Sequence, residues 1–205
     1  MQNQKGKAYL ALTVATLAFA ANFSVWILYA VAGIRLKTTL GLSATDLGIL
    51  LSAPMLTGAI FRLPIGFLAE KYPAKRLFIL QMCFLLPPLW FLQHAQTFSD
   101  FILLGLWIGI AGVSFTIGIR YVVDWFDSKE QGTAMGIFGA GNAGAAITLI
   151  LAPEIIEHLG FNWLGPMYAA GMIFVILLFS LLAPSTPDFI QHKHSFTWAQ
   201  HIKPL

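Results

Sequence analysis

Charged residues are scarce in this 205-residue chain: Asp, Glu, Lys and Arg make up only 10% of it, while 58% is hydrophobic and the mean hydropathy is +0.75. A water-soluble domain carries about 25% charged residues, so the soluble enzyme classes are largely excluded. Cysteine is nearly absent as well. The single Cys83 has no partner, which excludes a disulfide framework and a cysteine metal site. This composition indicates a membrane protein.

Catalytic and cofactor motifs are also missing. No Ser/His/Asp set, paired carboxylate or metal cluster lies at a plausible common depth. Residues 139–144 match the dinucleotide pattern G-x-G-x-x-G, but the sequence provides no preceding strand or βαβ unit. His192 and His194 offer too few ligands for a closed metal site. We therefore predict a protein that is not an enzyme and that binds no cofactor, metal or nucleic acid.

What the chain does have is a series of six long apolar runs bounded by charges or turn residues. Each is long enough to cross a hydrocarbon core of about 30 Å at about 1.5 Å per residue. The expected spans are 8–34, 46–69, 76–94, 98–123, 132–156 and 163–183. We expect an all-α membrane protein with one six-helix domain over 1–184 and a loose polar tail over 185–205. The spacing of Ser43 and Asp46 predicts a helix cap, and Ser99 with Asp100 predicts another.

Basic residues in the short connections set the expected orientation. If the N-terminus is cytoplasmic, only Arg35 and Lys37 lie outside. The nine basic residues inside are Lys5, Lys7, Lys71, Lys75, Arg76, Arg120, Lys129, Lys193 and Lys203. We therefore predict a multi-pass protein of the inner (plasma) membrane with both termini in the cytoplasm. The net charge of +3 reflects this bias and requires no nucleic-acid partner.

Arg62 is the one basic residue that belongs to neither side. It lies eight residues before Glu70, or about 12 Å from the helix end, and therefore near the bilayer midplane. Burying a guanidinium there costs at least about 2.5 kcal/mol, so the side chain is expected to face a protein interior or a watery cavity. Its planar fork suits an oxyanion or a carboxylate better than a sugar or a cation. The alternative is an arginine that pairs with an acid from another helix.

Small residues recur every four positions in the fifth span, so that one helix face is nearly bare. The residues of this helix-packing stripe are Gly132, Gly136, Ala140 and Gly144. Asn142 interrupts the stripe with an amide that either joins two helices or contacts a substrate, and the sequence favours neither. The fourth span contains a shorter set, Gly105, Gly109 and Gly112, followed by Phe115.

The connection between the second and third spans reads GFLAEKYPAKR over residues 66–76. It resembles the loop signature of the major facilitator superfamily, G-x-L-A-D-R-x-G-R-R, with Glu70 in place of Asp and Pro in place of the second Gly. The resemblance implies that Gly66, Glu70, Lys71 and Arg76 lock cytoplasmic helix ends in one state of a transport cycle.

Two further stretches, LTGAIFRLPIG over 56–66 and a discontinuous set over 112–144, closely resemble the nitrate/nitrite porter family of that superfamily. The second stretch includes the nitrate signature of the family's fifth helix. The resemblance implies transport of nitrate or nitrite, with Arg62 binding the anion, Asn142 contacting it and Phe115 flanking it.

Members of that family have twelve helices in two halves of six, with the substrate held between the halves. The match covers residues 8–184, which corresponds to the N-terminal half only. Three hypotheses follow: half of a split transporter paired with a separate C-terminal six-helix half, a pair of identical copies, or a truncated product without transport activity. Another small organic anion is the main alternative substrate, because a guanidinium also binds carboxylates.

Overall fold

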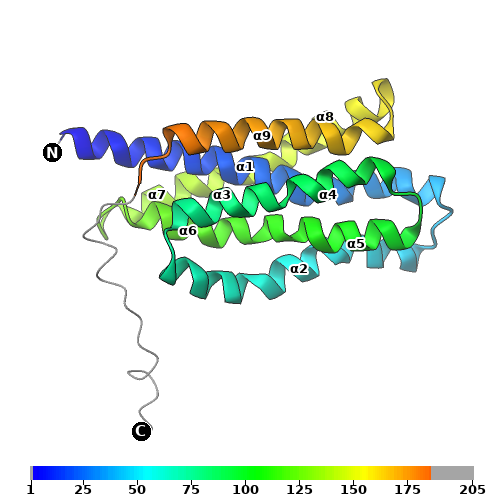
Figure 1. Cartoon of the computed structure of the whole chain (residues 1–205), viewed down its shortest axis with the longest axis horizontal. Coiled ribbons are helices and arrows are strands. Elements are labelled where there is room, and N and C mark those ends of the chain that lie inside the picture. The colour runs from blue at the N-terminus through cyan, green and yellow to red at the C-terminus, as the bar shows by residue number, and fades with distance from the viewer. Residues whose placement is uncertain (1, 186–205) are drawn as a thin grey trace, which may run out of the picture.

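The computed structural model describes residues 2–185, and the predicted polar tail lies, except for Ser185, outside the described residues. The described part of the chain is helical throughout, with short connections and no strand. Six helical stretches are long and apolar enough to cross a membrane, which confirms the expected fold class (Figure 1). These spans are Gln4–Thr39, Ala44–Lys71, Ala74–His94, Phe98–Val123, Gln131–His158 and Phe161–Leu182.

Several spans are built from more than one helical element. The elements are α1 (Gln2–Thr39), α2 (Ala44–Lys71), α3 (Ala74–Phe84), α4 (Leu86–Phe91), η1 (Leu92–His94), α5 (Phe98–Ile108), η2 (Gly109–Val113), α6 (Ser114–Val123), α7 (Gln131–Gly139), η3 (Ala140–Ala143), α8 (Gly144–His158), η4 (Phe161–Trp163) and α9 (Leu164–Leu182). The elements labelled η are short 3₁₀-helices. Two of them, η2 and η3, interrupt the fourth and fifth spans where glycine and alanine are concentrated, and such breaks often mark hinges.

Helix starts follow local hydrogen-bonding rules. Ser43 caps α2 as predicted: its hydroxyl accepts from the Asp46 N–H at 3.1 Å, and the Asp46 carboxylate accepts from the Ser43 N–H at 3.1 Å. The second predicted cap is wrong, because Thr97 and not Ser99 caps α5. Thr97 stands three residues before Asp100, which is the spacing that lets the two residues bond each other's N–H groups.

Helix α1 occupies the centre of the bundle, where it packs along α8 and α9 and also contacts α2, α6 and α7. Its approach to α8 requires a glycine, since a Cβ atom at Gly144 would lie 2.0 Å from the Ala20 carbonyl oxygen. The Thr148 hydroxyl fastens the same contact by donating to the Ser24 carbonyl at 2.7 Å. Helices α2 and α9 lie on opposite sides of the bundle (Figure 1).

A buried pair of amides joins α1 to the third and fourth spans. The Gln81 amide nitrogen donates to the Asn22 side-chain oxygen at 2.8 Å and to the Ile110 carbonyl at 3.2 Å. Hydrogen bonds of this kind hold helices together where lipid provides no hydrophobic drive. The pair therefore ties the η2 break to the centre of the bundle.

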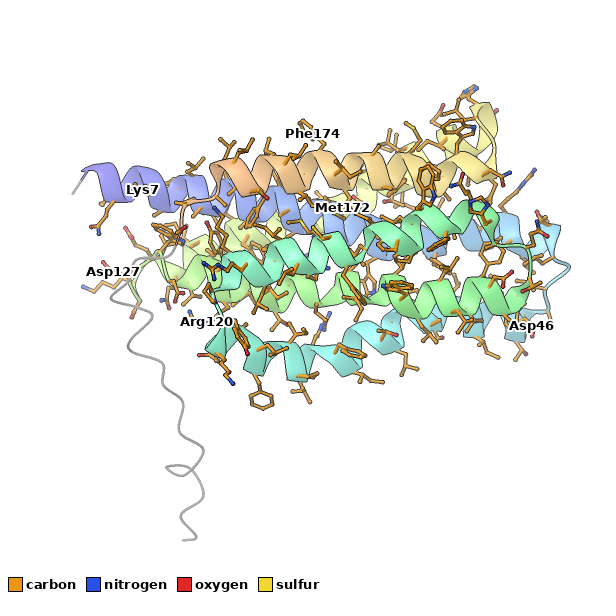
Figure 2. All side chains as sticks on the ribbon, viewed as in Figure 1. Lys7, Asp46, Arg120, Asp127, Met172 and Phe174 are labelled. Atoms are coloured by element: carbon orange, nitrogen blue, oxygen red, sulfur yellow. The ribbon has the colours of Figure 1, made fainter. Side chains whose placement is uncertain are left out.

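The outer helix α9 shows the two-sided character of a helix at the lipid boundary. Met172 points into the bundle and is buried, whereas Phe174 points away and is 65% exposed (Figure 2). Large apolar side chains are also exposed on the other spans, as expected where the surroundings are lipid and not water.

Candidate functional site

Arg62 lies on the exposed surface of α2, with its guanidinium carbon 5.7 Å from the centre of the Trp26 ring on α1. No acidic side chain of the described residues forms an ion pair with it. The alternative of an arginine neutralised by an acid therefore lacks support in this structure. A cation–π contact uses none of the N–H donors of the guanidinium, so they stay available to an anion.

Trp26 is fixed by the crossing of α2 and η2. Its indole N–H donates to the Pro54 carbonyl at 3.2 Å. Glycines make room for the ring: a Cβ atom at Gly58 would lie 3.4 Å from it, and one at Gly112 would lie 3.2 Å from it. The glycines that the sequence singled out in the fourth span thus pack inside the bundle, and one of them, Gly112, makes room for the indole that contacts Arg62.

A row of aromatic rings leads from Trp26 along α1. The ring centres of Trp26 and Phe23 are 5.5 Å apart, those of Phe23 and Phe19 are 5.7 Å apart, and those of Phe19 and Phe115 are 5.4 Å apart. Phe138 stacks on Phe19 at 4.9 Å. The row therefore connects two of the predicted site residues, Arg62 at one end and the half-exposed Phe115 at the other.

Asn142 lies in η3 with an exposed side chain. Its amide donates to the Gly139 carbonyl of the same span at 3.0 Å and, within the described part of the chain, bonds no other helix. The preceding residue, Gly141, packs on Phe19, because a Cβ atom there would lie 2.4 Å from that ring. The backbone before Asn142 thus packs on the aromatic row, while the Asn142 side chain itself is exposed.

The small-residue stripe of the fifth span is divided. Gly144 packs against the backbone of α1, as described above. At Gly132 and Gly136 a Cβ atom would meet nothing within 4 Å, and Ala140 is exposed. Only one end of the stripe is used by a helix of the described residues, and the rest forms an open surface.

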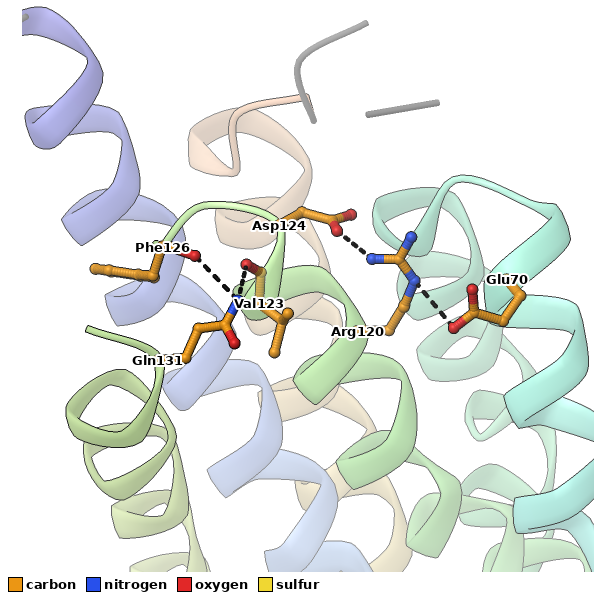
Figure 3. A network of polar contacts seen from close by, with 6 residues as sticks. All are labelled: Glu70, Arg120, Val123, Asp124, Phe126 and Gln131. Carbon is orange, nitrogen blue, oxygen red and sulfur yellow. Dashed lines mark hydrogen bonds and ion pairs between the residues drawn. The ribbon is translucent and has the colours of Figure 1, made fainter. Parts of the chain in front are cut away.

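The loop signature residues lie at the end of the bundle where α2 stops. Glu70 forms an ion pair with Arg120 of α6, with the Glu70 Oε1 and Arg120 Nε atoms 3.3 Å apart (Figure 3). Arg120 also pairs with Asp124, one helical turn further along the chain. This ion pair was not predicted, although the four-residue spacing of Arg120 and Asp124 is typical of a helical ion pair.

The other signature residues surround this network. Gly66 faces α6, where a Cβ atom would lie 3.8 Å from the Thr116 methyl group. The Lys71 ammonium lies 5.7 Å from the centre of the Tyr72 ring, and the Arg76 side chain is exposed. The signature thus joins α2 to α6 through one ion pair and the van der Waals contact of Gly66 with Thr116.

Gln131 holds the neighbouring loop. Its amide nitrogen donates to the Phe126 carbonyl at 3.1 Å and to the Val123 carbonyl at 3.4 Å (Figure 3). The Val123 carbonyl ends α6 and the Phe126 carbonyl lies in the turn after it, where helical partners for carbonyl groups run out. This bond fixes the start of α7 relative to the Arg120 network.

Comparison with known proteins agrees with this arrangement. The chain is 33% identical over 172 residues to the "probable nitrate/nitrite antiporter NarK1" of Thermus thermophilus, covering 83% of this chain and 39% of that protein. It is 32% identical over 178 residues to the "probable nitrate transporter NarT" of Staphylococcus carnosus (strain TM300), covering 86% of this chain and 46% of the relative. It is 28% identical over 176 residues to the "nitrite extrusion protein" of Bacillus subtilis (strain 168), covering 86% of this chain and 44% of that relative.

The chain spans less than half the length of each of these three relatives. Their names confirm the resemblance to nitrate/nitrite transporters that the second, fourth and fifth spans predicted. The family model described as Major Facilitator Superfamily matches residues 14–199, which include all but the first turns of the six-span bundle. The chain is therefore a multi-pass membrane protein that belongs to the Major Facilitator Superfamily.

Proposed function

We propose that this chain supplies one wall of a membrane pathway for nitrate or nitrite, with Arg62 as the anion-binding group. The observation that carries the proposal is an exposed guanidinium, far from the helix ends, that contacts Trp26 and has no acidic partner among the described residues. An unpaired charge at that depth is costly, so it is retained where a ligand needs it.

The chemistry of the surroundings favours a small planar oxyanion. The guanidinium fork donates two parallel hydrogen bonds to two oxygens of one anion. The aromatic row between Trp26 and Phe115 gives the site an apolar border. Its rings can make van der Waals contact with a flat anion, and they offer few hydrogen-bond donors to the anion's oxygens. We assign the exposed Asn142 amide as a second contact for the anion. The names of the relatives support nitrate or nitrite as the transported ion.

The second wall comes from another six-helix unit. Helix α2, which carries Arg62, also exposes large apolar side chains on its other sides, such as Leu63 at 73% and Ile60 at 56% exposure. The open part of the small-residue stripe, at Gly132 and Gly136, is suited to close approach of a further helix. A C-terminal six-helix half is the proposed partner, and a second copy of the chain is the alternative.

The membrane orientation follows from the basic residues. By the positive-inside rule, we assign the N-terminal residues 1–7 and the C-terminal residues 185–205 to the cytoplasmic side of the inner membrane. The Glu70–Arg120–Asp124 network then lies at the cytoplasmic end, where it fastens α2 to α6 in one state of the transport cycle.

The test is nitrate flux into vesicles that contain the chain, alone and together with a C-terminal six-helix half. Wild-type chain is expected to give flux in at least the combined vesicles, and Arg62→Ala is expected to abolish it. The matched control is Arg35→Ala, which removes an exposed arginine near the end of α1 and is expected to leave flux unchanged. Equal flux with Arg62→Ala and wild type would contradict the assigned role, and absence of wild-type flux in both vesicle types would contradict the function.

A further inference from the structure

Helices α8 and α9 both pack along α1 but scarcely touch each other, and a groove with a volume of about 390 Å³ lies between them. Its floor is the part of α1 around Ala20 and Ala21. Leu151 of α8 stands on one wall, and Phe174 and Val175 of α9 stand on the other. The small floor residues give the groove its depth, since larger side chains there would fill it.

The lining is almost entirely hydrocarbon. No acidic or basic side chain contributes to it, and the two polar side chains present are those of Ser24 and Tyr168. The Ser24 hydroxyl is already bonded, at 2.9 Å from the Ala20 carbonyl oxygen and 2.8 Å from the Gly144 carbonyl oxygen. Of the two, only the Tyr168 hydroxyl has no hydrogen-bond partner among the described residues. A single hydroxyl in an otherwise apolar lining does not hold an anion, so the groove suits an apolar occupant.

The groove opens away from the Arg62 surface. Arg62 belongs to α2, which lies across the bundle from α9 (Figure 1). Rim side chains such as Phe174, 65% exposed, and Leu151, 48% exposed, face outward. Because both walls belong to membrane-spanning stretches, the mouth of the groove opens to the hydrocarbon of the bilayer and not to water.

The dimensions fit a lipid tail. On α9 the lining runs from Met167 to Leu178, eleven residue steps and therefore about 16 Å. Half of a hydrocarbon core of about 30 Å is a similar length. An unfilled groove would forfeit the dispersion contacts of its lining, whereas an acyl chain restores them without displacing any protein group.

We propose that this groove is a binding site for one acyl chain of a membrane phospholipid. The site is independent of the proposed anion pathway: it lies on the other side of α1, and its occupancy requires no nitrate.

The experiment uses the full chain in phospholipid vesicles that contain a small amount of phosphatidylcholine with a photoreactive diazirine on one acyl chain. After illumination, mass spectrometry maps the labelled residues. Labelling of Ala20 and Ala21 on the groove floor is expected to exceed that of the fully buried Leu28 of the same helix, which gives the background. Lipid that merely covers the outer surface would label rim residues and leave the floor at background.

A filling variant and a matched control decide the origin of the floor labelling. Gly171→Leu places a side chain in the groove where a Cβ atom meets nothing within 4 Å, so floor labelling is expected to fall to background. Ala170→Leu enlarges the adjacent exposed residue, which does not line the groove, and is expected to keep wild-type labelling.

Three results would overturn the proposal. Floor labelling at background in the wild type would show that no acyl chain enters. Labelling of the floor by a photoreactive free fatty acid but not by the phospholipid would assign the groove to a different ligand. Efficient disulfide formation between two copies of a Gly171→Cys variant that lacks Cys83 would show that a second copy of the protein covers the groove.

Discussion

A single methyl group at Gly109 tests the helix crossing that positions Trp26 and Arg62. A Cβ atom there would lie 2.5 Å from the Pro54 carbonyl oxygen and 2.7 Å from the Thr57 Cβ atom, both on α2. Because these neighbours are held by the α2 backbone, Gly109→Ala must push α2 and η2 apart. Overpacking of this kind costs about 1–3 kcal/mol.

The assay is thermal unfolding of the purified chain in one detergent at one heating rate. For a chain of this size, about 2–4 °C corresponds to 1 kcal/mol, so Gly109→Ala should unfold several degrees below the wild type. Gly136→Ala is the matched control, because its Cβ atom meets nothing within 4 Å and alanine favours a helix by about 1 kcal/mol over glycine. A Gly109→Ala midpoint at or above that of Gly136→Ala would refute the packing of α2 on η2.

Three further substitutions test other contacts. Lys75→Met removes the ammonium that bonds the last carbonyls of α9 at 3.2 and 2.5 Å, and should destabilise the chain by about 1–2 kcal/mol in thermal unfolding, whereas Arg76→Met, at an exposed side chain, should not. Arg120→Gln leaves Asp124 without its ion-pair partner and should speed proteolysis of the loop after α6; an unchanged rate would contradict the network's role. Thr148→Val removes a 2.7 Å hydrogen bond from α8 to α1 and should cost about 0.6 kcal/mol, up to about 1.7, by the same unfolding assay.

The sequence predicted the spans well because apolar length is a direct requirement of the bilayer. The second to sixth expected spans agree with the structure to within two residues at each end, while the first is longer than expected at both ends. The cap at Ser43 was predictable from local spacing. The cap at Thr97 was missed because Ser99 is closer to Asp100 in sequence, although only Thr97 has the three-residue spacing of a capping box.

The candidate site was predictable in part. The depth of Arg62 and the scarcity of acids in the spans already favoured an unpaired guanidinium. Trp26 could not be identified, because its contact with Arg62 depends on how α1 packs against α2 and on glycines in a third span. Sequence patterns report such tertiary contacts only indirectly.

Glycine spacing shows the same limit. The fourth and fifth spans both carry small residues at helical intervals, yet Gly109 packs inside the bundle while Gly132 and Gly136 face an open surface. Spacing predicts a face that another helix can approach closely. Which helix approaches it is decided by the arrangement of the whole bundle.

The most direct test of the central claim, that Arg62 recognises a planar oxyanion, is competition against labelled nitrate in vesicles that contain this chain and a C-terminal six-helix half. Unlabelled nitrate and nitrite should reduce labelled flux more than chloride at the same concentration does, because chloride offers one acceptor atom in place of two oxygens spaced for the parallel bonds of the guanidinium fork. Arg62→Lys keeps the charge and loses the fork, so it should lose nitrate flux. Equal competition by chloride and nitrate in the wild type would contradict the claim.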